Sequence, residues 1–441
     1  MSANGPDELF HDRPRTPVDR DPKKTPVKSL CQFTCVSTRW RSLISDPYFI
    51  DLHLTHSATR PKLLVGFHDP DDERGGVFSV DQLEPHNGRA QIATLPFSFH
   101  GWTGPFVLQS QQGLVSLEVG GHIQITNPLT GMYATFGLPR ITERYASFSC
   151  YQQMHSFGFD PVERKHKVLS TRVIIMGGLD GRLIMESWVL TLGTEKWRQV
   201  EGCAAHDKKG REVCFDGVVY YMAWSCLHGV HGDDYLVAFD VRTESFRMIT
   251  IPAEAHKDIH RALLIKFEEH VAMVDRNKAL SCEEIIMWIP EDFDQEIWKK
   301  RVFSLPSYWK EIAPDRRVFP VGTVRSGELL FAPRTLSKPV CMFYYNLKTN
   351  SLRRSEICGL DDVSPEFCAL TFLNHVENVR IQDLRQLLSD GKAKNGPQSL
   401  FPPNGERTCQ RARKMFITMN VKANERAQAS EVLKLATMVR C

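Results

Sequence analysis

The sequence lacks any long apolar stretch. Residues 1–24 are polar, so we expect no signal peptide in that segment. No run approaches the roughly 20 apolar residues that a membrane-spanning helix needs. The 12 cysteines are scattered from Cys31 to Cys441 without paired spacing, as is typical of reduced cysteines that behave as small apolar residues. We therefore predict no disulfides, no membrane partner, and a location in the cytoplasm, the nucleus or both.

Sequence motifs of common enzyme classes are also absent. There is no Gly-x-Ser-x-Gly nucleophile turn, no phosphate-binding loop that ends in Gly-Lys-Ser or Gly-Lys-Thr, and no His-Glu-x-x-His zinc motif. The glycine-rich "GGLDGRL" from Gly177 lies among strand-like sequence, whereas a dinucleotide site would need a helix after it. We predict no catalytic residue, no cofactor and no enzyme activity.

Two groups of side chains are candidate metal ligands. The first group pairs two cysteines with two downstream histidines, namely Cys31, Cys35, His53 and His56. The second lies in the polar segment "CLHGVHGDD" and comprises His228, His231, Asp233 and Asp234. The first spacing fits a zinc finger badly, and polar loops commonly carry such residues because they are solvated. We predict no metal site.

The chain carries little net charge. Its 55 Lys and Arg residues against 52 Asp and Glu residues leave a formal charge of +3, which by itself indicates no nucleic-acid partner. The distribution is uneven, because residues 380–441 hold a surplus of seven positive charges. A basic tail of this kind is usually solvated, so we assign it no binding role.

Helical sequence is concentrated near the amino end. Residues 1–24 are interrupted by four prolines, and we predict disorder there. Residues 25–60 carry two helix-start signals, Thr25-Pro26 and Asp46-Pro47, in each of which a capping residue precedes proline. Apolar residues follow the first signal at helical spacing: Leu30, Phe33, Val36, Trp40 and Leu43. Two helices this short cannot close a core alone, so we expect them to pack on a third helix or on a partner protein.

Residues 61–380 have the texture of β-strands, with a loose internal repeat. "SFGFDPVERKHKVL", "YLVAFDVRTESFRMI" and "CMFYYNLKTNSLRRSEI" each join two strand-like runs through a turn that begins at Asp160, Asp240 or Asn346. A second hairpin, such as "DGVVYYMAW", lies between several of these. Four-stranded repeats are typical of a β-propeller. We predict a mainly β, propeller-like (kelch-like) domain of unassigned blade number, with a large β-sandwich as the alternative.

The remaining features complete the predicted domain plan. Residues 381–441 follow the strands as a linker and an atypical basic tail.

Five tryptophans fall at predicted strand positions, namely Trp188, Trp197, Trp288, Trp298 and Trp309. Core packing accounts for most of them, and any that faced the centre of a propeller would be a binding anchor.

These motifs resemble those of a large plant protein family. "PVKSLCQFTCVSTRWRSLISDPYFIDLHL" is similar to the second half of a plant F-box, and "SFGFDPVERKHKVL", "LVAFDVRTESFRMI" and "GELLFAP" resemble the F-box-associated (type 3-like) domain. The resemblance covers about residues 26–379. It implies the substrate-recognition subunit of an SCF-type (SKP–cullin–F-box) ubiquitin ligase, in which the F-box binds a SKP-type adaptor and the propeller binds a protein substrate. The implied adaptor-binding residues are Leu30, Val36, Trp40, Arg41 and Leu43.

One stretch departs from the family pattern. The family's F-box begins with a helix of the type Leu-Pro-x-x-Leu-x-x-Glu-Ile-Leu, whereas this chain has the proline-rich "DELFHDRPRTPVDRDPKKTP". The first half of the F-box is therefore missing or degenerate in our interpretation.

One alternative is a non-catalytic propeller interaction module that no longer docks the ligase. Another is a propeller enzyme or sugar-binding protein, which a metal bound at His228 and His231 would favour. The substrate stays unassigned.

Overall fold

The structure is a computed structural model whose described residues fall in a series of segments. They are 27, 29–30, 37–68, 74–82, 90–98, 108–119, 121–130, 132–140, 149–175, 183–194, 196–227, 230–255, 262–275, 284–313, 318–333, 335–336, 339–360 and 367–379. Met1–Asp390 form one compact unit and Gly391–Cys441 a second. The predictions for residues 1–24 and 381–441 lie outside the described residues. All helices and strands below belong to the first unit.

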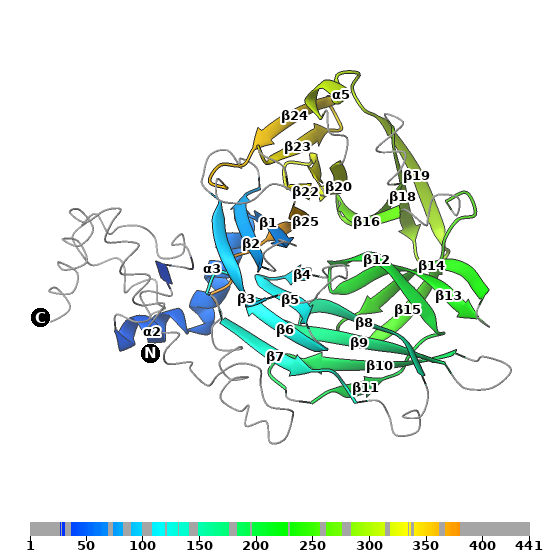
Figure 1. Ribbon diagram of the computed structural model, residues 1–441, viewed down its shortest axis with the longest axis horizontal. Coiled ribbons are helices and arrows are strands. Elements are labelled where there is room, and N and C mark those ends of the chain that lie inside the picture. The colour runs from blue at the N-terminus through cyan, green and yellow to red at the C-terminus, as the bar shows by residue number, and fades with distance from the viewer. Residues whose placement is uncertain are drawn as a thin grey trace, which may run out of the picture. The chain divides into compact units, whose positions relative to one another are not determined.

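The described strands form six antiparallel groups, which we call blades 1 to 6 (Figure 1). Blade 1 contains β22 (Thr335–Leu336), β25 (Phe367–His375), β1 (Lys62–His68), β2 (Arg74–Asp81) and β3 (Gln91–Ser98). Blade 2 contains β4 (Leu108–Gln111), β5 (Leu114–Val119), β6 (His122–Asn127) and β7 (Met132–Gly137). Blade 3 contains β8 (Ser149–Asp160), β9 (Lys165–Ile175), β10 (Leu183–Thr191) and β11 (Arg198–Val200).

The other three blades follow in sequence. Blade 4 contains β12 (His206–Phe215), β13 (Val218–Leu227), β14 (Val230–Asp240) and β15 (Ser245–Thr250). Blade 5 contains β16 (Ala262–Phe267), β17 (His270–Asp275), β18 (Glu284–Asp292) and β19 (Ile297–Ser304). Blade 6 contains β20 (Val318–Thr323), β21 (Leu329–Pro333), β23 (Cys341–Asn346) and β24 (Ser351–Glu356). Blades 5 and 6 are joined into one sheet by a parallel pairing of Lys266 with Gly322.

The blades close into a ring. Strand β4 contacts β8, β8 contacts β12, β12 contacts β16, and β16 contacts β20. Strand β25 contacts both β20 and β4, which completes the circuit. Within blade 1, β25 from the end of the domain pairs with β1 from its beginning, for example Val65 with Thr371. A sandwich of two sheets would not give this cyclic order, so the predicted propeller-like fold is confirmed.

The repeated turn predicted from the sequence is present in most blades. In blade 4, Oδ1 of Asp240 accepts hydrogen bonds from the backbone N–H groups of Arg242 and Thr243, both at 2.8 Å. Glu244, four residues after the aspartate, has a φ of 58°. The same pattern, in which an Asp or Asn is followed four residues later by a residue of positive φ, recurs at Asp160, Asp292 and Asn346. The Asp or Asn side chain thus stabilises a tight turn that reverses the strand.

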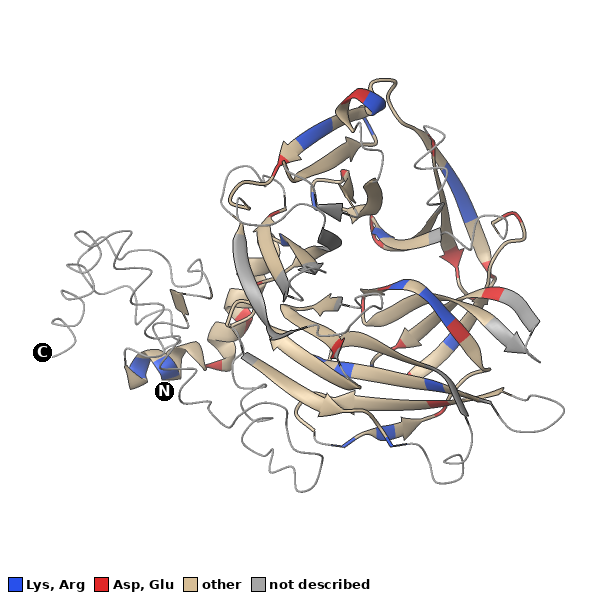
Figure 2. Ribbon diagram, in the orientation of Figure 1, with Lys and Arg blue, Asp and Glu red and all other residues tan. Residues whose placement is uncertain are grey.

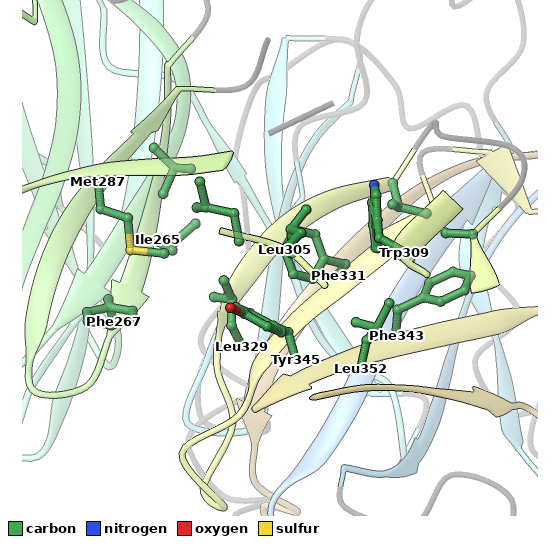
Figure 3. Close-up of a cluster of buried hydrophobic side chains, with 14 of the residues drawn as sticks. Ile265, Phe267, Met287, Leu305, Trp309, Leu329, Phe331, Phe343, Tyr345 and Leu352 are labelled. Carbon is green, nitrogen blue, oxygen red and sulfur yellow. The ribbon is translucent and has the colours of Figure 1, made fainter. Parts of the chain in front are cut away.

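Apolar side chains fill the space between neighbouring blades. Figure 3 shows the cluster between blades 5 and 6, to which Phe267 and Met287 contribute from one blade and Phe331 and Phe343 from the other. Trp309 lies on a short helix, α5 (Trp309–Ile312), in a region where the sequence indicated only strands. Its ring packs 5.5 Å from that of Phe331, centroid to centroid, and is 3% exposed. This helix therefore caps the cluster as part of the core.

Two tryptophans connect neighbouring blades through their indole N–H groups. Trp197 of blade 3 donates to the carbonyl of Gly137 in blade 2 at 2.8 Å. Trp298 of blade 5 donates to the carbonyl of Thr250 in blade 4 at 3.0 Å. In each case the acceptor lies at the end of the last strand of the preceding blade. Both residues therefore join blades structurally, a role the sequence alone did not distinguish from core packing.

Candidate functional site

Two well-formed helices precede the propeller, and local capping explains where they begin. Helix α3 (Pro47–Thr59) starts with the predicted Asp46-Pro47 signal, and Oδ1 of Asp46 accepts from the N–H groups of Tyr48 and Phe49. Helix α2 (Thr38–Ile44) has its own cap, because Oγ of Ser37 accepts from the N–H of Trp40. A separate helix start at Ser37 was not anticipated from the apolar spacing. The helix start at Ser37 therefore interrupts the run of apolar residues from Leu30 to Leu43, which the sequence analysis placed at continuous helical spacing.

The apolar side of these helices faces the propeller. Leu30 and Ile44 are 0% and 1% exposed. They belong to a buried cluster with Val379, which follows β25 of the propeller. Leu129, in the turn between β6 and β7, also packs against this cluster. The third structural element that the helices needed is thus supplied by the chain's own propeller domain.

A buried carboxylate, Glu377, joins the helices to the propeller. It forms an ion pair with Lys62 of β1 at 2.5 Å and accepts the backbone N–H of Val27 at 3.3 Å. Its own N–H donates to Oγ of Ser57 in α3 at 2.6 Å. Burial alone would raise the pKa of Glu377, but the charge and hydrogen bonds of Lys62, the N–H of Val27 and the nearby His53 outweigh it. The net effect is a pKa below the ordinary 4.5.

Further polar links attach α3 to turns at one end of the blades. Asp51 pairs with Arg164 in the β8–β9 turn. The carbonyl of Ala58 accepts from Nη1 of Arg325, in the β20–β21 turn, at 3.1 Å. These contacts come from two well-separated blades, so the helices are held at more than one point. We call the end of the blades that carries these turns the helix face.

The exposed side of the helices is a candidate docking surface. Arg41 is exposed, and Trp40 and Leu43 are half-buried because each also packs against the buried cluster that contains Leu30 and Ile44. Tyr48, at the start of α3, is 53% exposed. We name these four residues the α2–α3 surface. Of the five residues with implied adaptor-binding roles, Trp40, Arg41 and Leu43 lie on this surface, Leu30 lies beneath it, and Val36 lies outside the described residues.

The interior of the ring contains a hydrogen-bonded polar network. Nζ of Lys208, on β12, donates to the carbonyl of His155 at 3.1 Å and to Oγ of Ser156 at 2.9 Å, and it also pairs with Glu212. Oε1 of Glu212 in turn accepts the N–H of Phe157 at 3.1 Å. This network ties the first strands of blades 3 and 4 together. Its hydrogen bonds give it a structural role.

In the "CLHGVHGDD" segment the side chain of Asp234 is described, whereas those of His228, His231 and Asp233 lie outside the described residues. Asp234 accepts from Nζ of Lys209 at 2.9 Å, and that ammonium lies 3.0 Å from the centroid of the Trp224 ring. Burial lowers the pKa of Lys209, and the Asp234 carboxylate opposes this shift. Within the residues that the structure describes, no three His, Cys, Asp or Glu side chains are grouped to hold a metal.

None of the described helices has the length and apolar character needed to cross a membrane.

Comparison with known proteins gives two family matches. Residues 62–376 match the model described as "F-box associated beta propeller domain". Residues 23–52 match the model of the F-box domain. The second range contains α2 and the first part of α3, and the first range contains all the strands described above.

Full-length relatives agree with these matches. The chain is 31% identical over 397 residues to "F-box protein DOR" of Arabidopsis thaliana, a match that covers 86% of this chain and 96% of the relative. It is 31% identical over 415 residues to "F-box protein At2g16450" of the same plant, with 83% and 93% covered. Among solved structures, the dipeptidyl peptidase 4 of Porphyromonas gingivalis aligns with 8% identity over 66% of this chain and 44% of that chain. Its TM-score of 0.32 is too low to support a conclusion.

Proposed function

This chain belongs to the F-box proteins that carry an F-box associated β-propeller domain, and we propose from this that it is the substrate-recognition subunit of an SCF-type ubiquitin ligase. In this role the helices bind a SKP-type adaptor and, through it, a cullin, and the propeller binds the protein to be ubiquitinated. The chain itself catalyses nothing. It acts in the cytoplasm or the nucleus by raising the effective concentration of substrate near the ligase.

The attachment of the helices to the propeller is the observation that best supports this role. A receptor must present its substrate to the ligase, and a fixed connection between the two binding surfaces limits the orientations that the substrate can take. Here the buried Glu377 contacts Lys62 of the first strand and Val27 and Ser57 of the helical segment. A flexible linker would have left these polar groups to solvent.

We assign adaptor binding to the α2–α3 surface. Its members Trp40, Leu43 and Tyr48 combine apolar area with the exposed charge of Arg41, which is the composition of many interface centres. Leu30 contributes indirectly, because its burial against Ile44 and Val379 holds α2 in place.

Retention of the full chain on an immobilised SKP-type adaptor tests the proposal. We expect Arg41→Glu combined with Tyr48→Ala to weaken retention at least tenfold, because both side chains are exposed and lie on the proposed surface. Tyr133→Ala is the matched control, since Tyr133 is also an exposed tyrosine, at 41%, but lies on β7 of the propeller. An equal loss of retention in the Tyr133→Ala control would show that the adaptor binds outside the α2–α3 surface.

A negative result with the unaltered chain has a defined meaning. If the folded wild-type protein is not retained by any SKP-type adaptor, the receptor proposal is wrong for this chain. The remaining function would then be that of a propeller interaction module that binds its partner without joining a ligase. The burial of Leu30, which removes one apolar side chain from the accessible surface, is the observation that keeps this second candidate open.

A further inference from the structure

A polar groove of about 780 Å³ lies between blades 3 and 4. One wall comes from β9, β11 and the turn between β10 and β11, and the other from the turn between β14 and β15. Figure 2 shows basic and acidic segments interspersed on these strands. Glu163 and Lys165 line one end of the groove, and the residue between them, Arg164, pairs with Asp51 of α3. One end of the groove is therefore formed by the β8–β9 turn, which also contacts α3 on the helix face.

A single buried carboxylate organises the charges of this groove. Glu244 pairs with Lys167 at 2.9 Å and also with Arg198. The side chains of Lys167 and Glu244 are 6% and 7% exposed, whereas that of Arg198 is 62% exposed. Two cations thus share one anion, which leaves one positive charge in excess. That charge resides on the guanidinium that reaches into the groove.

The other charged residues of the groove do not cancel this excess. Lys165 and Glu163 lie 3.8 Å apart and balance each other. Arg242 and Glu201 are both exposed lining residues of opposite sign. The groove as a whole therefore keeps one excess positive charge. Its two exposed arginines are suited to bind carboxylates through paired N–H groups.

One wall of the groove also offers an open strand edge. Strand β11 is the outermost strand of blade 3, and among the described strands none pairs with its outer side. Its residues Arg198, Gln199 and Val200 all line the groove. An open edge presents backbone N–H and C=O groups that a short extended peptide can satisfy.

We propose that this groove binds an extended acidic segment of a partner protein, which adds as a strand to β11 while its carboxylates meet Arg198 and Arg242. The inference rests on the proposed function, because it names this segment as part of the substrate that the receptor recognises. It places one end of the substrate segment at the β8–β9 turn, which contacts α3 through the Arg164–Asp51 pair.

Peptide selection on the full-length protein tests the proposal. A random heptapeptide library is selected on the wild-type chain and, in parallel, on Arg198→Glu/Arg242→Glu. We expect the wild-type selection to be enriched in Asp and Glu, and the double variant to lose that enrichment and bind the selected peptides at least tenfold more weakly. Arg301→Glu is the matched control, because Arg301 is 37% exposed and pairs with Glu268 outside the groove. It should bind like the wild type.

Each outcome decides the question. No acidic enrichment on the wild type, or equal binding by the double variant, overturns the groove assignment. N-methylation of alternate peptide bonds in a selected peptide should abolish binding, and unchanged binding would exclude strand addition to β11.

Retention on the SKP-type adaptor is measured for the same variants. If the double variant keeps adaptor binding and loses the peptides, both proposals stand; loss of adaptor binding alone would overturn the assignment to substrate.

Discussion

The carboxylate of Glu377 accepts the backbone N–H of Val27, a residue 350 positions earlier in the sequence. The same carboxylate pairs with Lys62 of β1, and β1 pairs with β25, which ends two residues before Glu377. The segment that closes the propeller ring is thus the segment on which the helices dock. Helix docking and ring closure share their contacts, so the helices and the propeller should unfold together rather than as separate domains.

The first prediction concerns this shared contact. Glu377→Ala should lower the free energy of unfolding by about 3 kcal/mol, because it leaves the Lys62 ammonium and the N–H of Val27 without their buried partner. Urea denaturation followed by tryptophan fluorescence measures the change. Glu356→Ala, at an exposed glutamate of β24, is the control and should change stability by less than about 0.5 kcal/mol.

The double variant Lys62→Met/Glu377→Leu separates the charge from the packing. It should be more stable than Glu377→Ala, because no unpaired charge remains at the buried position. A double variant that is no more stable than Glu377→Ala would show that leaving the Lys62 ammonium unpaired costs little. Proteolysis should cleave the helical segment faster in Glu377→Ala, and equal cleavage rates would contradict the idea that Glu377 holds the helices.

A second prediction concerns acid stability. Burial lowers the pKa of His375 to about 4 from the ordinary 6.5, so the folded protein keeps this imidazole neutral. The unfolded chain takes up the proton near pH 6.5, and stability is therefore complete above that pH and falls as the pH decreases toward 4. The full effect of this one group is about 3 kcal/mol. The depressed pKa of Glu377 adds a further loss below about pH 4.5, in the same direction.

Urea denaturation at a series of pH values tests this assignment. His375→Gln should flatten the decrease between pH 6.5 and 4, because the group that takes up the proton only on unfolding is gone. His122→Gln, at an exposed histidine of β6, is the matched substitution for comparison. If both variants retain the wild-type slope, the acid sensitivity belongs to other groups, and His375 is not its source.

Local sequence signals predicted much of the fold. Asp46-Pro47 marked the start of α3, and Asp160, Asp240 and Asn346 marked repeated turns, because an Asp or Asn side chain caps nearby N–H groups whatever the tertiary context. Such signals act over two or three residues and can be recognised in one sequence. The blade number could not be read in this way, because ring closure is decided by the pairing of β25 with β1.

The orientation of the helical surface was beyond local reasoning. The apolar spacing of Leu30 and Trp40 indicates one buried face but not what covers it. Val379, whose position near Leu30 follows only from ring closure, takes that place. The bonds from Trp197 and Trp298 to neighbouring blades were equally unreadable, because an indole that packs in a core and one that donates to a distant carbonyl look alike in sequence.

A third prediction compares two glycines of positive φ in blade 2. Gly113 has a φ of 82°, and an added Cβ would lie 2.4 Å from Cβ of Asn378 and 2.7 Å from the carbonyl oxygen of Val376. Gly121 has a φ of 76° and no atom within 4 Å of that position. Gly121→Ala should therefore cost only the backbone strain, about 1 kcal/mol.

Gly113→Ala adds a collision with backbone that follows the ring-closing strand, so it should cost about 3 kcal/mol or more and lower the thermal midpoint much further than Gly121→Ala. Scanning calorimetry of the two variants gives the comparison directly. Similar midpoints for both would mean that the 376–378 segment can shift away from blade 2, against the tight contact seen in the structure.

The last prediction tests whether the blade-to-blade tryptophan bonds act independently. Trp197→Phe removes the donor to Gly137, and Trp298→Phe removes the donor to Thr250, while each keeps most of the aromatic area. Each should lower the free energy of unfolding by about 1 kcal/mol, the usual net contribution of such a bond. Because the two sites lie in blades 3 and 5 and share no partner, the double variant should lose the sum of the two single effects within about 0.5 kcal/mol. A loss clearly larger than the sum would show that strain passes around the ring from one blade contact to the next, whereas no loss in either single variant would mean that solvent satisfies these carbonyls equally well.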